Sequence, residues 1–101
     1  MVVDVLRLGD VPVARVSHAP GWRWTVHSAA EAGTDFCANS HVGVMIAGRM
    51  MVQLIDGTRY EAVAGDALAI AAGHDAWTLG DVPAVLVQFD EGESARARYR
   101  L

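Results

Sequence analysis

The sequence predicts an all-β domain of about eight to ten short strands that form a β-sandwich or a small barrel. Two observations support this fold class. Hydrophobic residues alternate with polar ones along almost the whole chain, which is the period of a strand with one buried face. Glycine, aspartate and proline interrupt the alternation about every 8–12 residues, as they do between short strands. At 101 residues, 52% of them hydrophobic, the chain is expected to be one domain with a modest core.

The first half of the chain contains four predicted strands. The pair Gly9-Asp10 separates the first two, and a turn over residues 18–21 separates the second from the third. The third is rich in aromatic and branched residues, which favour extended structure. Only residues 28–33 have a helical composition, and six residues form barely two turns. The predicted strands cover residues 3–8, 11–16, 22–27 and 42–47.

The second half continues the same pattern. Gly48-Arg49 is a hairpin candidate, and Asp56-Gly57 is a stronger one because this dipeptide accepts the positive φ angles of a tight turn. The predicted strands here cover residues 50–55, 67–71, 76–79 and 84–89. We therefore expect a single antiparallel, double-sheet barrel over residues 1–101, with its core at about 8–90 and a polar tail at 91–101.

Composition excludes several classes of partner. The net charge of −4 argues against nucleic acid. No apolar run approaches the roughly 20 residues of a membrane helix, and the first residues do not have the pattern of a signal peptide. A single cysteine cannot form an internal disulfide, and a free thiol suits a reducing compartment, so we expect a cytoplasmic protein.

Cys37 and His41 are the first candidates for chemistry. On a regular strand, residues four apart share a face but lie roughly 13 Å apart, too far to bind one ion. They can converge only if the chain turns between them, and residues 38–40 (Ala-Asn-Ser) are turn formers. A buried, inert thiol followed by an ordinary core histidine is the alternative.

Five segments of the chain together resemble the cupin superfamily, in particular small single-domain bacterial cupins. They are PGWRW (20–24), GTDFC (33–37), HVGVMIAGRM (41–50), DGTRYEAVAGD (56–66) and GHDAWTLGDVPAVLV (73–87). The resemblance spans residues 8–90 and implies a jelly-roll-like β-barrel. It implies no particular activity, because this fold carries enzymes, binding proteins and metal-free domains alike.

The resemblance also implies a metal site, with departures from the family pattern. Counted back from Gly48, His41 occupies the position of the family's glutamate ligand, and Cys37 and Asp35 occupy those of two histidines. A second alignment places the first histidine at His27. In the second motif alanines stand at 71 and 76, where proline and histidine are usual, and His74 lies two residues before position 76 on the same strand face.

We therefore expect His27, Cys37, His41 and His74 to converge on one metal ion. Nitrogen and sulfur ligands suit zinc first and ferrous iron next. Asp35 could orient an imidazole by a hydrogen bond or simply cap a turn.

The residues expected to line the pocket are Arg23, Thr25, Met45 and Trp77. Asp75 should point away from His74 by strand alternation and serve a structural role. No catalytic triad, phosphate loop or spaced pair of carboxylates is evident, so no catalytic residue is assigned.

Three functions remain open. The first is a metal-dependent enzyme that acts on a small organic molecule, as an isomerase, cyclase, lyase or dioxygenase. The second is a non-catalytic module that binds a ligand or holds a structural metal. The third is a metal-free domain in which Cys37 is a redox-sensitive thiol. We also expect a homodimer in which residues 1–16 pair with a partner chain, because exposed edge strands are usually covered.

Overall fold

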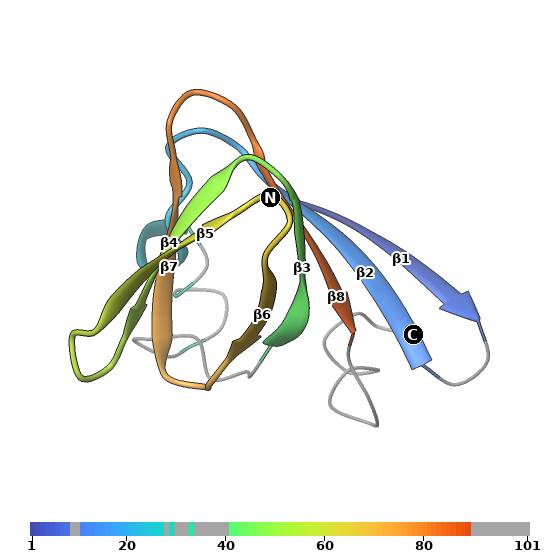
Figure 1. Ribbon diagram of the computed structural model, residues 1–101, viewed down its shortest axis with the longest axis horizontal. Coiled ribbons are helices and arrows are strands. Elements are labelled where there is room, and N and C mark those ends of the chain that lie inside the picture. The colour runs from blue at the N-terminus through green and yellow to red at the C-terminus, as the bar shows by residue number, and fades with distance from the viewer. Residues whose placement is uncertain (9–10, 28, 30–32, 34–40, 90–101) are drawn as a thin grey trace.

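The computed structural model describes residues 1–8, 11–27, 29, 33 and 41–89. Within these residues, eight strands form two antiparallel sheets, and there is one short helix (Figure 1). This confirms the all-β, double-sheet fold. The elements are β1 (Val2–Leu8), β2 (Val11–His18), α1 (Trp24–His27), β3 (His41–Ala47), β4 (Arg49–Leu54), β5 (Arg59–Val63), β6 (Ala67–Ile70), β7 (His74–Leu79) and β8 (Ala84–Phe89).

The two sheets differ in size and in the part of the chain they use. The larger has the strand order β1-β2-β8-β3-β6, and the smaller has the order β5-β4-β7. The chain passes between them repeatedly, so strands that follow one another in sequence often lie in different sheets. Consecutive strands pair directly only in the β1–β2 and β4–β5 hairpins.

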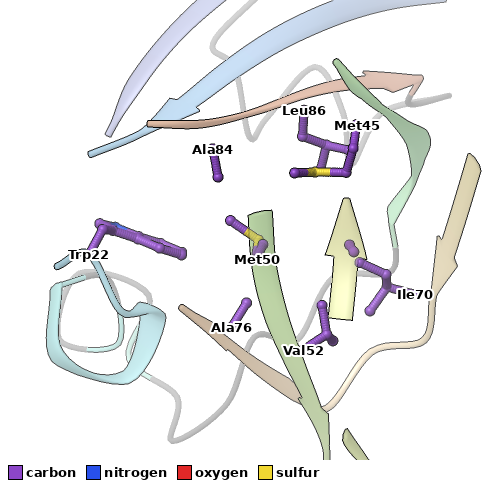
Figure 2. Packing of buried hydrophobic residues seen from close by; sticks show 9 residues of the cluster. Trp22, Met45, Met50, Val52, Ile70, Ala76, Ala84 and Leu86 are labelled. Atoms are coloured by element: carbon purple, nitrogen blue, oxygen red, sulfur yellow. The ribbon is translucent and has the colours of Figure 1, made fainter. Parts of the chain in front are cut away.

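Strand alternation places the core between the sheets. On β8, Ala84 and Leu86 are buried, and on β4 so are Met50 and Val52. These side chains meet from opposite sheets around the fully buried Met45 (Figure 2). Burying a side chain of this size contributes about 1.5–3 kcal/mol. The core residues are Trp22, Met45, Met50, Val52, Ala62, Ile70, Ala76, Ala84 and Leu86.

The two hairpin predictions have different outcomes. Asp56-Gly57 does connect paired strands: Gly57 has φ 90°, and the backbone N–H of Leu54 donates to the carbonyl of Thr58 at 2.8 Å. Gly48, in contrast, does not turn a hairpin, because β3 and β4 lie in different sheets. It has φ 72° and forms a corner where the chain leaves the larger sheet for the smaller one.

Residues 22–27 do not form the predicted strand. Arg23 forms an isolated bridge with Trp77 of β7, but its carbonyl accepts bonds from the N–H groups of Val26 and His27, which makes Trp24–His27 a short helix. Contacts with β7 override the strand propensity of the segment, as tertiary contacts often do. The expected helix at 28–33 falls mostly outside the described residues.

The amino-terminal strand pairs within its own chain. Strand β1 forms a hairpin with β2, in which Val2 lies opposite Ser17 and Leu8 opposite Val11. Pairing of this segment with a partner subunit stays a prediction. Strand β1 remains an edge of the larger sheet. Among the described residues, no helix is long and apolar enough to span a membrane.

His18 is the last residue of β2 and is buried, not part of the predicted surface turn. Its ring packs against Trp22 at a centroid distance of 4.4 Å, and its Nδ1 lies 3.1 Å from the carbonyl oxygen of Ala84. Burial lowers the pKa of His18 from 6.5 to about 4, which the Ala84 contact partly opposes. The imidazole is therefore neutral at pH 7.

This depressed pKa predicts a loss of stability in mild acid. Between pH 6.5 and about 4 the unfolded chain binds a proton at His18 that the folded chain does not, so the free energy of unfolding falls as pH decreases. The full contribution is about 3 kcal/mol. Urea unfolding at pH 7 and pH 4.5 should show a smaller pH difference for His18→Phe than for the unaltered chain. An equal difference in both proteins would contradict the assignment.

Candidate functional site

Two of the four proposed metal ligands meet at one end of the barrel. His41 is the first residue of β3 in the larger sheet, and His74 is the first residue of β7 in the smaller sheet. Their rings face each other edge to face, with centroids 5.0 Å apart and an interplanar angle of 71°. The structure thus brings together two histidines that are 33 positions apart in the sequence, one from each sheet.

A tight turn fixes the ring of His74. Gly73 has φ 84°, and the turn returns the carbonyl oxygen of Ala71 to 2.8 Å from His74 Nδ1. A carbonyl can only accept, so Nδ1 carries the proton and donates it. Burial lowers the pKa of His74, although the Ala71 bond and the charge of Asp75 oppose the shift. His74 is therefore a neutral imidazole whose lone pair lies on Nε2.

A hydrogen bond to Gln88 fixes the ring of His41 in the same way. Gln88 lies on β8 with its side chain buried among inward-facing residues, and its Oε1 is 2.8 Å from His41 Nδ1. With Oε1 as acceptor, His41 also donates from Nδ1 and has its lone pair on Nε2. Sequence reasoning missed Gln88. The available signal was a single amide at an inward position of an otherwise apolar strand, Ala84–Phe89.

A glycine lets the two strands that carry this bond approach closely. Gly43 lies opposite Gln88 on β3. A Cβ atom at Gly43 would lie 2.1 Å from the carbonyl oxygen of Val87, closer than atoms can approach. The absence of a side chain at this position therefore helps to bring Gln88 within reach of His41.

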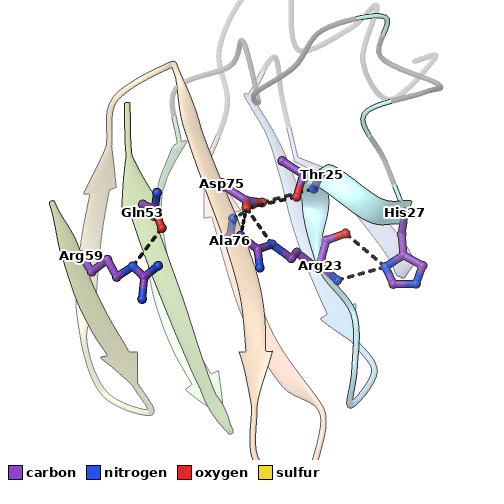
Figure 3. Close-up of polar contacts among 7 residues, drawn as sticks. All are labelled: Arg23, Thr25, His27, Gln53, Arg59, Asp75 and Ala76. Atoms are coloured by element: carbon purple, nitrogen blue, oxygen red, sulfur yellow. Dashed lines mark hydrogen bonds and ion pairs between the residues drawn. The ribbon is translucent and has the colours of Figure 1, made fainter. Parts of the chain in front are cut away.

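The other proposed ligands are placed differently. Cys37 and Asp35 lie outside the described residues. His27 is exposed on α1, where its Nδ1 accepts the backbone N–H of Arg23 at 3.0 Å. Its ring lies on the side of Arg23 away from β7 (Figure 3). Within the part of the chain that the structure describes, no three His, Cys, Asp or Glu residues form a group that could hold a metal ion.

The histidine pair has the spacing that a shared ion requires. Zinc–nitrogen bonds are about 2.0–2.1 Å long, so two imidazoles on one tetrahedral ion have centroids about 5 Å apart. The observed centroid distance is 5.0 Å. Hydrogen bonds from Nδ1 to oxygen acceptors are the usual support of metal-binding imidazoles. The two imidazoles are therefore close enough to be two ligands of one transition-metal ion.

The expected pocket residues divide between the core and the outer surface. Met45 is fully buried in the core. Arg23, Thr25 and Trp77 lie instead on the outer face of the smaller sheet. Asp75 and Trp77 alternate with the buried Ala76 along β7, so their side chains point to the opposite side of the sheet. Arg23 and Thr25 contact Asp75 on that side (Figure 3). The assignment of Arg23 and Thr25 to the barrel interior rested on a strand at 22–27 that does not form.

These outer residues surround Asp75, which confirms its structural use. The carboxylate is 1% exposed and accepts bonds from Arg23 Nε at 2.8 Å and from the backbone N–H of Thr25 at 3.1 Å. The hydroxyl of Thr25 and the N–H of Ala76 also donate to it. The guanidinium of Arg23 covers the ring of Trp77 at 4.4 Å. The network attaches α1 to β7.

Comparison with solved structures identifies the architecture. A cupin 2 conserved barrel domain protein from Salinispora arenicola matches 97% of this chain and 81% of its own length, with a TM-score of 0.64 and 16% identity. A cupin superfamily protein from Desulfitobacterium hafniense matches 91% of this chain and 77% of its own length, with a TM-score of 0.62 and 16% identity. A cupin-2 domain containing protein from Shewanella frigidimarina matches 90% of this chain and 80% of its own length, with a TM-score of 0.60 and 14% identity.

Neither protein-family models nor curated proteins give a match to this sequence. At 16% identity or less, the structural likeness establishes the fold and not the activity. The two antiparallel sheets and the core between them agree with the cupin resemblance of the five sequence segments. The structural neighbours agree with that resemblance as well. The chain is a small domain with the cupin fold.

Proposed function

We propose that this cupin domain binds a divalent transition metal through His41 and His74, with zinc as the first choice and iron as the second. The observation that carries the proposal is that both rings have the same tautomer. Each has its Nδ1 proton directed at an oxygen acceptor, which leaves the metal-binding lone pair on Nε2. The rings come from opposite sheets and have the separation that a shared ion requires.

Cys37 is proposed as the third ligand. It precedes His41 by four residues, on the segment that leads into β3. A thiolate beside two imidazoles makes a set that favours zinc over harder cations. His27 is left out of the proposed set because it is exposed and bonded to the backbone of Arg23.

Three protein ligands would leave one position for a small organic molecule or water. When bound, the ion would polarise a carbonyl group or activate water or oxygen, which suits isomerase, cyclase, lyase or dioxygenase chemistry. The chain's own residues hold and orient the site: Gln88 and Ala71 fix the rings, and burial keeps His74 neutral. Any substrate would bind at the histidine end, because Met45, Met50 and Val52 fill the middle of the barrel.

That filled interior favours a second candidate, a structural metal in a non-catalytic module. The two functions differ in whether the ion has an exchangeable position. Cobalt substituted for zinc gives a visible spectrum that reports its coordination. A spectral change on addition of azide would favour the enzyme, and an unchanged four-coordinate spectrum would favour the structural ion.

Metal uptake tests the site itself. The purified domain should bind one zinc ion per chain, measured by elemental analysis and titration calorimetry. His41→Ala, His74→Ala and Cys37→Ser should each reduce the affinity by at least about 10–100-fold, since each removes a ligand.

His27→Ala is the matched control, because it removes an exposed imidazole outside the proposed set and should bind zinc normally. Circular dichroism would show that each variant keeps its strands. Full zinc occupancy in His41→Ala or His74→Ala would overturn the proposal.

A further inference from the structure

Two arginines on the outer face of the smaller sheet contact the same tryptophan. Arg23 directly precedes α1, Arg59 is the first residue of β5, and Trp77 lies on β7. The guanidinium carbon of Arg23 is 4.4 Å from the centroid of the Trp77 ring, and that of Arg59 is 5.2 Å from it. Both are cation–π distances. The two positive groups are therefore close neighbours, separated by no more than the sum of these two distances.

Each guanidinium group is held in place through its Nε atom. Arg23 Nε donates to Oδ2 of Asp75 at 2.8 Å, and its Nη2 lies 2.8 Å from the same oxygen. Arg59 Nε donates to Oε1 of Gln53 at 2.8 Å. The strand register places Arg59, Gln53 and the buried Asp75 side by side in one row. These bonds fix both side chains before any ligand binds.

The terminal nitrogens of the two arginines remain available as donors. Within the part of the chain that the structure describes, no acceptor contacts Nη1 of Arg23 or either Nη atom of Arg59. The side chain of Arg23 is 43% exposed, and Arg59 is exposed as well. Figure 3 shows both arginines on the same side of the smaller sheet, with their guanidinium groups directed toward each other. A ligand on this face can therefore reach both.

The charge of Arg59 is not neutralised by a carboxylate among the described residues. Asp75 is paired with Arg23 at 2.8 Å, and Glu61 is paired with Arg49 at 3.0 Å. Arg59 itself is bonded to a neutral amide. The net charge of −4 repels anions from the molecule as a whole. A bound anion must therefore contact the two guanidinium groups directly.

We propose that Arg23, Arg59 and Trp77 form a binding site for an oxyanion, the phosphate or carboxylate group of a small ligand. The Nη groups of both arginines donate charge-assisted hydrogen bonds to the oxygens of the anion, which is the chemistry that guanidinium groups suit best. Because Asp75 and Gln53 already fix the two side chains, binding costs little side-chain entropy.

The proposed anion site is separate from the histidine pair. Asp75 and Trp77 alternate along β7 with His74 and Ala76, so they point to the opposite side of the sheet. The inference therefore does not depend on the proposed metal ion. The alternative role for the two arginines is only to cover the ring of Trp77, and in that case no anion binds.

Titration with inorganic phosphate at constant ionic strength, followed by proton–nitrogen NMR, tests the site. Saturable shifts are expected for the indole N–H of Trp77 and for the Nε–H groups of Arg23 and Arg59. Arg59→Gln should weaken phosphate binding by at least about 10-fold, because it removes hydrogen bonds from a charged donor. The variant should fold normally, since Arg59 is exposed, and its NMR spectrum would show this.

Arg15→Gln is the matched control for charge. It removes an arginine whose side chain is 62% exposed on the larger sheet, and it should bind phosphate normally. His41→Ala is the control for the metal site and should also bind phosphate normally. A parallel titration with acetate distinguishes the source of the anion: tighter binding of phosphate indicates a phosphorylated ligand, and tighter binding of acetate indicates a carboxylate ligand.

Three results would overturn the proposal. The first is the absence of saturable shifts with both anions, which would leave the arginines as a cover for Trp77. The second is equal weakening by Arg15→Gln and Arg59→Gln, which would mean general attraction and no site. The third is loss of binding in His41→Ala but not in Arg59→Gln, which would place the anion on a metal ion.

Discussion

Replacing Asp75 with asparagine is expected to lower the free energy of unfolding by about 3 kcal/mol. The carboxylate is buried and accepts donors from Arg23, Thr25 and Ala76. Asparagine keeps one acceptor oxygen but turns an NH₂ group toward N–H donors, and it leaves the charge of Arg23 without its partner. Because the Arg23 side chain is 43% exposed, water offsets part of the loss, so the effect lies at the low end of the range for buried ion pairs.

Urea unfolding followed by circular dichroism measures this effect. Glu61→Gln is a suitable control, since it breaks an exposed ion pair with Arg49 whose side chains are 41% and 53% exposed. Its cost should stay below about 1 kcal/mol. A similar small cost for Asp75→Asn would mean that the network contributes little and that α1 is held by the packing of Trp22.

Gly48→Ala is expected to destabilise the fold by about 3 kcal/mol or more, through two additive effects. The residue has φ 72°, a conformation that costs a residue with a Cβ atom about 1–2 kcal/mol. That Cβ would also lie 2.2 Å from the carbonyl oxygen of Pro83 and 2.8 Å from the Cα of Ala84. Both contacts are backbone atoms, so relief requires the loop before β8 to move away from the corner.

Gly57→Ala separates these two effects. Gly57 has a similar angle, φ 90°, but a Cβ at this position would meet nothing within 4 Å. Its cost should therefore be the conformational penalty alone, about 1–2 kcal/mol. Thermal or urea unfolding of the two variants gives the comparison directly. Equal costs would show that the loop at Pro83 yields without penalty and that the corner is not tightly packed.

The fold could be read from the sequence because its signals are local. Alternation with a period of two determines which side chains are buried, and Asp56-Gly57 specifies its own turn. The corner at Gly48 could not be distinguished from a hairpin, because both need a glycine with positive φ. The difference is the sheet that the next strand joins, and this depends on distant residues such as Pro83.

The site could be predicted only in part, for a related reason. His41 and His74 were identified by their positions in motifs, and strand parity gave their common direction. His27 was misplaced because a run of aromatic and branched residues predicts a strand. The helix forms through the donors that Thr25 and Arg23 supply to Asp75, which lies 50 and 52 positions away. Gln88 was missed because its role depends on a hydrogen bond to His41, which lies on the neighbouring strand β3.

The two histidines belong to different sheets, and this would make an ion bound by both a cross-link between the halves of the barrel. Separating the sheets would require release of the ion, so the resistance of the protein to heat and denaturant would depend on free metal concentration. At 100 times the dissociation constant the gain is about 2.7 kcal/mol. A chain of this size has a total stability on the order of 5–15 kcal/mol. Metal supply would then set the lifetime of the folded protein as well as its chemistry.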